Sequence, residues 1–128
     1  MIEIAEDEFS IEEMVQRARR IDAGAVVSFL GTVRDDGIRG MEVEVYREAA
    51  LEELERIRDE AMESFDLISV DVVHRTGRLL VGDPIVLIVC AAGHREAAFK
   101  GCEYVLEELK RRAPIWKKEI SDRGERWV

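Results

Sequence analysis

The sequence contains few cysteines and no long apolar run, and both features exclude classes of protein. Only two cysteines occur among the 128 residues, and neither belongs to a C-x-x-C motif or to a Cys/His ligand spacing. We expect Cys90 and Cys102 to be buried structural thiols rather than part of a redox or metal centre. The apolar runs 84–93 and 23–31 are too short to cross a bilayer.

Residues 1–8 are acidic, where a secretory signal peptide would be basic. A cytoplasmic location is therefore the expectation from the sequence. The length predicts a single domain over residues 1–128, large enough for one hydrophobic core.

Positive charge is also scarce, because 19 Lys and Arg are outnumbered by 28 Asp and Glu, for a net charge of −9. Nucleic-acid binding needs a broad basic face, so this balance argues against it as a general activity. The imbalance is uneven along the chain. Residues 1–93 hold 10 basic and 21 acidic side chains, whereas residues 94–128 hold 9 and 7. A small anionic ligand in a local basic pocket remains compatible with this composition.

Helical periodicity predicts three helices. Ser10-Ile11-Glu12-Glu13 has the form of a capping box, and the amphipathic helix that follows is predicted to end near Gly24. The second and third helices are predicted at about 48–65 and 94–112, with Pro114 ending the third.

Strands are predicted at 25–33, 41–46, 67–75, 84–92 and 115–120. The loop 35–40 is interpreted as a hairpin connection, and the turn-rich segment 77–84 has room for one more short strand. This order of elements indicates an α+β fold, with helices packed on a mostly antiparallel sheet.

The segment 109–119, Leu-Lys-Arg-Arg-Ala-Pro-Ile-Trp-Lys-Lys-Glu, opposes the acidic balance of the chain. Cations at a helix C-terminus complement its dipole, which by itself explains Lys110 and Arg111. Lys117, in a strand, has no such explanation. Two lysines in one pocket disfavour each other's charged form, and a lysine pKa lowered by about 3 units allows proton transfer or nucleophilic attack near pH 7. The segment predicts an anion site with lysine-assisted chemistry.

Two further positions are candidates for anion binding, each with a structural alternative. Arg34 follows a strand end, where an arginine is often simply solvated. His94 and Arg95 begin a helix, whose free N–H groups bind anions, although a histidine there is also a common cap. The similar pair His74-Arg75 lies within a predicted strand, and we interpret it as structural.

Four segments in order resemble the large, catalytic subunit of molybdopterin synthase. They are Gly24-Ala25-Val26-Val27-Ser28-Phe29-Leu30-Gly31-Thr32-Val33-Arg34, His74-Arg75-Thr76-Gly77-Arg78-Leu79 with Gly82-Asp83, His94-Arg95-Glu96-Ala97-Ala98-Phe99, and Leu109-Lys110 through Lys117-Lys118-Glu119 to Gly124 and Trp127. The resemblance covers nearly the whole chain. The chain ends just past Trp127, where many members continue, and its loop 35–40 is compact, so we expect the substrate to be less enclosed.

The resemblance implies an α/β-hammerhead-type fold with an additional small antiparallel sheet. It implies a sulfurtransferase of molybdenum cofactor biosynthesis, which takes sulfur from the C-terminal Gly-Gly thiocarboxylate of a small β-grasp carrier subunit. The acceptor would be cyclic pyranopterin monophosphate (precursor Z), converted to the dithiolene of molybdopterin. The implied assembly is a heterotetramer with a homodimer at its centre. No metal, tightly bound cofactor, nucleic acid or membrane is implied.

The resemblance also implies roles for residues of this sequence. Lys110 would be the central catalytic residue and Lys117 would assist it. Substrate binding would fall to the remaining candidates: Arg34, His94 and Arg95 for the phosphate and pterin, Thr32 and Val33 as lining, and Lys118 and Glu119 at the edge. The family completes its site across the dimer interface, so some of these residues would serve the neighbouring protomer.

Two rival classes remain open at this stage. A non-catalytic adaptor for a ubiquitin-like tail would have no need of Lys110 or Lys117, and both are present. A nucleotide- or anion-sensing module would need the His94-Arg95 site without the lysines. Binding of a nucleotide in the absence of any carrier would favour that second class.

Overall fold

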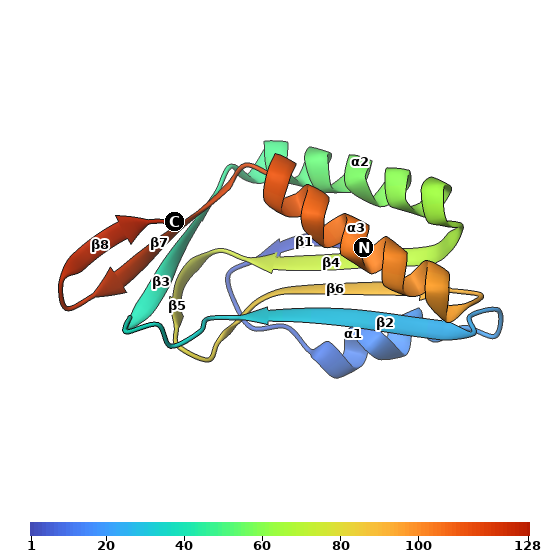
Figure 1. The fold of residues 1–128 in the computed structure, drawn as a ribbon, viewed down its shortest axis with the longest axis horizontal. Helices are drawn as coiled ribbons and strands as arrows, with labels where there is room; N and C mark the ends of the chain where they lie inside the picture. Colours follow the sequence, from blue (N-terminus) through green and yellow to red (C-terminus); the bar gives the residue numbers. More distant parts are fainter.

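The computed structural model describes residues 1–128, which form three helices and two four-stranded sheets (Figure 1). The helices are α1 (Ile11–Ala18), α2 (Arg47–Phe65) and α3 (Arg95–Arg112). No helix is both long enough and apolar enough to span a membrane. The predicted α+β class, with an additional small antiparallel sheet, is confirmed.

The larger sheet has the strand order β1-β4-β6-β2. Its strands are β1 (Ile2–Ala5), β4 (Leu67–Arg75), β6 (Pro84–Ala92) and β2 (Ala25–Thr32). Only the β1–β4 pair is parallel.

The smaller sheet has the order β5-β3-β7-β8 and is antiparallel throughout. Its strands are β5 (Gly77–Leu80), β3 (Gly40–Val45), β7 (Ile115–Ser121) and β8 (Gly124–Trp127). It extends beyond one end of the larger sheet, as Figure 1 shows at the left.

The central strands β4 and β6 are apolar on both faces, because helices cover both sides of the larger sheet. Successive side chains along each strand point to opposite faces of the sheet. Val72 and Ile88 belong to the main core beneath α2 and α3, whereas Val73 and Leu87 pack with Met14 of α1 on the other face. The main core also takes residues from the smaller sheet, which fixes that sheet to the helices.

Helix α1 begins as the capping box predicts, since the Ser10 hydroxyl oxygen accepts a hydrogen bond from the Glu13 N–H at 3.1 Å. The predicted end near Gly24 was wrong, because the helix ends at Ala18 and Arg19 is extended. The Gly24 N–H instead donates to the Ala92 carbonyl, which ties this segment to the larger sheet.

The prediction that loop 35–40 forms a hairpin was also wrong. Strands β2 and β3 lie in different sheets, because β2 pairs with β6 while β3 pairs with β5 and β7 on its two edges. The chain passes from the larger to the smaller sheet after Val33. The Val33 N–H donates to the Asp83 carbonyl and the Val33 carbonyl accepts from the Gly82 N–H, so neither group pairs with β3.

Strands β1 and β8 were missed, each being only four residues long. Strand β1 is held partly by an ion pair at 2.6 Å between the Met1 ammonium and Asp71 of β4, which lies 70 residues further along the chain. All four residues of β8 are exposed, so no buried apolar face reveals this strand.

Candidate functional site

A cavity of about 600 Å³ lies where the C-terminal end of α3 meets both sheets, and we call it the lysine cavity. Its floor is apolar and includes Phe29, Val86 and Leu109. Its polar lining consists of Thr32, Arg34, Asp36, His74, Lys110, Lys117 and Glu119. Five of the sequence-predicted site residues therefore come together here from β2, the loop after it, α3 and β7.

The two lysines reach the cavity because α3 stops and the chain reverses into β7. Ala113 is extended and the Pro114 carbonyl accepts the Tyr46 N–H, so the chain enters the smaller sheet directly after the helix. Lys110 lies in the last turn of α3, and Lys117 pairs opposite Val43 of β3.

Alternation along β7 decides which charged side chains face the cavity. Lys117 and Glu119 line it, whereas Lys118, expected from the resemblance at the edge of the substrate site, points to the other face. There the Lys118 ammonium lies 3.3 Å from Glu125 and 3.6 Å from Glu42, and 5.1 Å from the ring of Trp127. Hydrogen bonding to Glu125 raises the pKa of Lys118, which keeps this lysine charged.

Lys117 is the lysine whose protonation the cavity alters. It is half-buried, and burial lowers its pKa, with the positive charge of Lys110 acting in the same direction. Lys110 itself is exposed at the cavity mouth. The pair therefore combines an accessible cation with a partly desolvated amine.

Two ion pairs flank the lysines at the cavity edge. The Arg34 guanidinium lies 2.8 Å from Asp36, and the Glu119 carboxylate lies 2.8 Å from Arg126. The Arg34 side chain is 82% exposed, so an incoming anion can reach it. Val33, in contrast, is in the main core and does not line the cavity.

His94 and Arg95 lie elsewhere, at the opposite end of α3. They line a separate open hollow of about 480 Å³ with Gly24, Gly93 and Glu96. His94 makes no side-chain cap bond to the helix, so the first-turn N–H groups are not capped by it. Eighteen residues of helix span about 27 Å, and one protomer therefore does not bring these two residues to Lys110 and Lys117.

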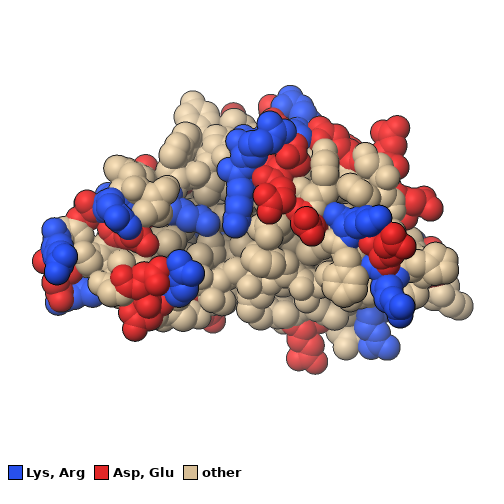
Figure 2. Space-filling view, in the orientation of Figure 1, with Lys and Arg blue, Asp and Glu red and all other residues tan.

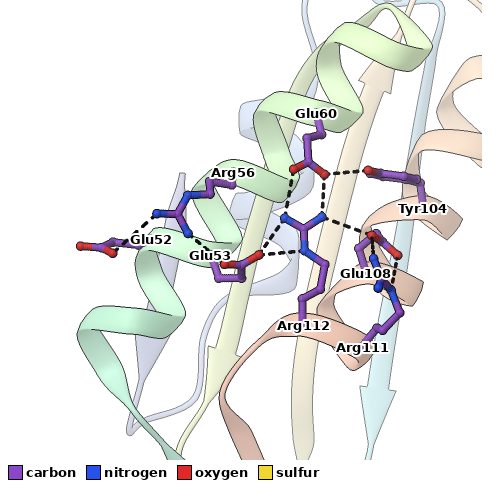
Figure 3. A network of polar contacts seen from close by, with 8 residues as sticks. All are labelled: Glu52, Glu53, Arg56, Glu60, Tyr104, Glu108, Arg111 and Arg112. Carbon is purple, nitrogen blue, oxygen red and sulfur yellow. Dashed lines mark hydrogen bonds and ion pairs between the residues drawn. The ribbon is translucent and has the colours of Figure 1, made fainter.

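The end of α3 is anchored to α2 by a charged network that the sequence did not reveal (Figure 3). The Arg112 guanidinium lies 2.7 Å from Glu53, 2.6 Å from Glu60 and 3.2 Å from Glu108. Tyr104 donates to Glu60 at 2.7 Å. Since Lys110 is two residues before Arg112, this network fixes the last turn of α3, which carries Lys110.

Acidic and basic side chains are interspersed on the face in Figure 2, in keeping with the net negative charge. A hollow of about 640 Å³ beside β1 and α1 is lined by five carboxylates, including Glu3 and Glu13, which disfavours a phosphate ligand. No cluster of three His, Cys, Asp or Glu side chains suited to a metal ion occurs.

Comparison with known proteins identifies a matching family. Residues 4–112 match the family described as MoaE protein. A molybdopterin synthase catalytic subunit of Pyrococcus abyssi is 40% identical over 95% of this chain and 85% of that relative.

Two solved structures share the fold. The crystal structure of molybdopterin synthase from Staphylococcus aureus is 35% identical, with a TM-score of 0.92 over 98% of this chain and 94% of that one. A complex of subunits 1 and 2 of molybdopterin-converting factor from Helicobacter pylori has a TM-score of 0.84 over 99% of this chain and 89% of that one. Its 23% identity makes that likeness one of fold.

Proposed function

The chain belongs to the MoaE protein family, and on this premise we propose that its lysine cavity is the sulfur-transfer site of a molybdopterin synthase catalytic subunit. Sulfur comes from the C-terminal thiocarboxylate of a small β-grasp carrier subunit. The acceptor is cyclic pyranopterin monophosphate, and the product is the dithiolene of molybdopterin.

The observation that carries the assignment is the pairing of Lys110 and Lys117 in one cavity with an apolar floor. Their positive charges attract a thiocarboxylate and then stabilise the oxyanion of the tetrahedral intermediate on the carrier carbonyl. The lowered pKa of Lys117, caused by burial and then by Lys110, suits it to give and take protons as the pterin ring is opened.

The carrier tail is proposed to enter as an extended segment. A Gly-Gly end has no side chains to obstruct a narrow approach, and extended tails commonly dock through their backbone. The thiocarboxylate sulfur bonds to a carbon of the pterin substrate, from which an oxygen leaves, and a thioester with the carrier results. Water then adds to the thioester carbonyl carbon, the bond from that carbon to sulfur breaks, and the carrier ends as a carboxylate. Two carrier molecules supply the two sulfurs of the dithiolene in this way. Thr32 and Glu119 border the same cavity, and we assign them contacts with the substrate and the tail.

The phosphate of the substrate is proposed to bind at His94 and Arg95 of the neighbouring protomer. A helix N-terminus offers free N–H groups and a positive dipole end, and Arg95 adds a charge-assisted donor. Because the two hollows lie at opposite ends of α3, a two-fold dimer that joins one protomer's hollow to the other's cavity completes the site. Arg34 then faces the pterin side of the ligand.

Each protomer acts as one domain over residues 1–128, since the main core joins both sheets.

The reaction itself tests this function. Purified protein is mixed with a thiocarboxylated carrier subunit and cyclic pyranopterin monophosphate, and molybdopterin is assayed. The proposal expects product from the wild type and from Lys118→Ala, whose side chain faces away from the cavity, and loss of product in Lys110→Ala. Carrier binding without product would instead indicate an adaptor. Nucleotide binding with no carrier binding would indicate an anion-sensing module.

A further inference from the structure

His74 is a buried histidine that lines the same cavity as the two lysines, although its position within a strand suggested a purely structural role. It lies on β4 between Ile4 of β1 and Val86 of β6, and only 1% of it is exposed. It lines the lysine cavity and also an adjoining hollow of about 320 Å³. Lys110, Lys117 and Leu109 line both spaces too, so the imidazole lies at the partition between them.

The hydrogen bonds of His74 fix its tautomer. Its Nδ1 lies 2.8 Å from the Arg75 carbonyl oxygen, which can only accept, so Nδ1 carries the hydrogen. Burial lowers the pKa of His74 to about 4, with the Arg75 carbonyl opposing the shift and the charge of Lys117 adding to it. The imidazole is therefore neutral near pH 7, and Nε2 holds an unshared electron pair.

That Nε2 atom is buried and has no hydrogen-bond partner. A buried acceptor without a donor is unfavourable, and such atoms in native proteins call for a donor within reach. Lys117 is the candidate donor, because its ammonium makes no ion pair of its own and its side chain lines the same two spaces as His74. The neighbouring Lys118, in contrast, is fully engaged with two carboxylates.

We propose that His74 is a positioning residue for Lys117: the Nε2 lone pair accepts an N–H of the lysine and holds its nitrogen towards the cavity. The inference rests on the sulfur-transfer function proposed above and deepens it, since it assigns a role to a residue outside the substrate contacts.

The direction of the interaction follows from the two side chains. An imidazole with a pKa of about 4 does not retain a proton in competition with a lysine amine, so the proton stays on Lys117. In the ammonium form, one N–H is bound to Nε2 and the others point to the ligand. In the amine form, the same bond aims the nitrogen lone pair away from the sheet and into the cavity. His74 therefore sets the geometry of Lys117 in both protonation states.

Two substitutions of His74 separate positioning from a structural role. His74→Gln places an amide oxygen near the site of Nε2, whereas His74→Asn places an amide near the site of Nδ1 and can preserve only the bond to Arg75. Positioning predicts that His74→Asn lowers kcat about 10-fold or more with little change in KM, while His74→Gln stays within about 3-fold of the wild type. A purely structural role predicts the reverse order, and that order, or equal losses, would overturn the proposal.

A measurement on the resting protein needs no activity and so is independent of the proposed function. The imidazole ¹⁵N resonances of His74 report the tautomer and any hydrogen bond at Nε2. In Lys117→Met the Nε2 resonance should move towards the value of an unbonded imidazole, whereas in Lys110→Met it should stay close to the wild type. An Nε2 resonance that ignores Lys117→Met, or that responds equally to both variants, would refute the contact even if the protein makes molybdopterin.

Discussion

Arg95 and Lys110 stand in the first and last turns of the same helix, and each lines a different hollow. Fifteen residues of helix separate their Cα atoms by about 22 Å along the axis. We propose that both residues serve one reaction, and on that proposal a complete site needs two protomers.

Lys117→Ala should lower turnover by about 10²-fold or more, because it removes the partly buried amine of the cavity. Lys118→Ala is the matched control, since it deletes the next lysine of the same strand on the opposite face. Turnover is measured with both variants under saturating carrier. Equal losses of turnover in the two variants would show that the total positive charge of β7, rather than Lys117 itself, governs the rate.

Lys110→Met should raise the pKa of Lys117, because the positive charge of Lys110 helps to lower it. The pKa should remain below its ordinary value, since burial is the larger cause and is unchanged. Competitive labelling of Lys117 with an amine reagent across pH measures the value directly. Arg111→Met is the control, because that side chain is paired with Glu108 outside the cavity.

The lowered pKa of Lys117 makes the stability of the fold depend on pH in the alkaline range. A lysine whose pKa is lowered by folding binds fewer protons in the native state than in the unfolded chain, so its contribution to stability rises with pH between the native value and about 10.5. In Lys110→Met this rise should be smaller. A midpoint of thermal unfolding that shows the same alkaline slope in both proteins would contradict the coupling.

Glu60 should account for part of the acid sensitivity of the fold. Hydrogen bonds from Arg112, and then from Tyr104, lower the pKa of Glu60 from 4.5 to about 2. Its contribution to stability is therefore present above pH 4.5 and is lost as the pH falls from 4.5 to about 2. Glu60→Gln should flatten the fall of the thermal midpoint in that window. Glu63→Gln, an exposed carboxylate of the same helix, should leave the slope unchanged.

Gly24→Ala should destabilise the fold next to the His94-Arg95 hollow by about 1–3 kcal/mol, because its new methyl group would meet the Gly93 carbonyl oxygen of the backbone. Gly93→Ala is the counterpart, since a methyl group there meets nothing within 4 Å. It should change the free energy of unfolding by about 0.5 kcal/mol or less. Denaturant unfolding of both variants compares them, and similar losses would contradict the packing argument.

Periodicity in the sequence predicted the helices and the long strands, because those elements bury a regular apolar face. It failed at β1, which is short and pairs with β4 far along the chain, and at β8, a short exposed strand that pairs only with the preceding β7. It also joined β2 to β3 as a hairpin, since nothing local shows that both edges of β3 are occupied by β5 and β7.

The sequence also predicted part of the candidate site, but not the contacts between distant elements. Residue types and family resemblance pointed to Lys110 and Lys117, and both line one cavity. The side chain of Lys118 could have been assigned to the outer face from strand alternation, had the register of β7 been known. The Arg112 network and the unpaired Nε2 of His74 depend on contacts between elements far apart in sequence, which no local pattern encodes.

The most direct test of the two-protomer site mixes two variants, each impaired alone when the substrate is limiting. Arg95→Ala and Lys110→Ala subunits are each assayed alone with carrier and substrate, then unfolded, mixed in equal amounts, refolded together and assayed again. If Arg95 of one protomer serves the cavity of the other, half of the dimers are mixed and each contains one intact site, so activity should recover to about one quarter of the wild type. Mixed dimers that stay as inactive as the parent variants would place Arg95 and Lys110 in the same protomer's site and contradict the account.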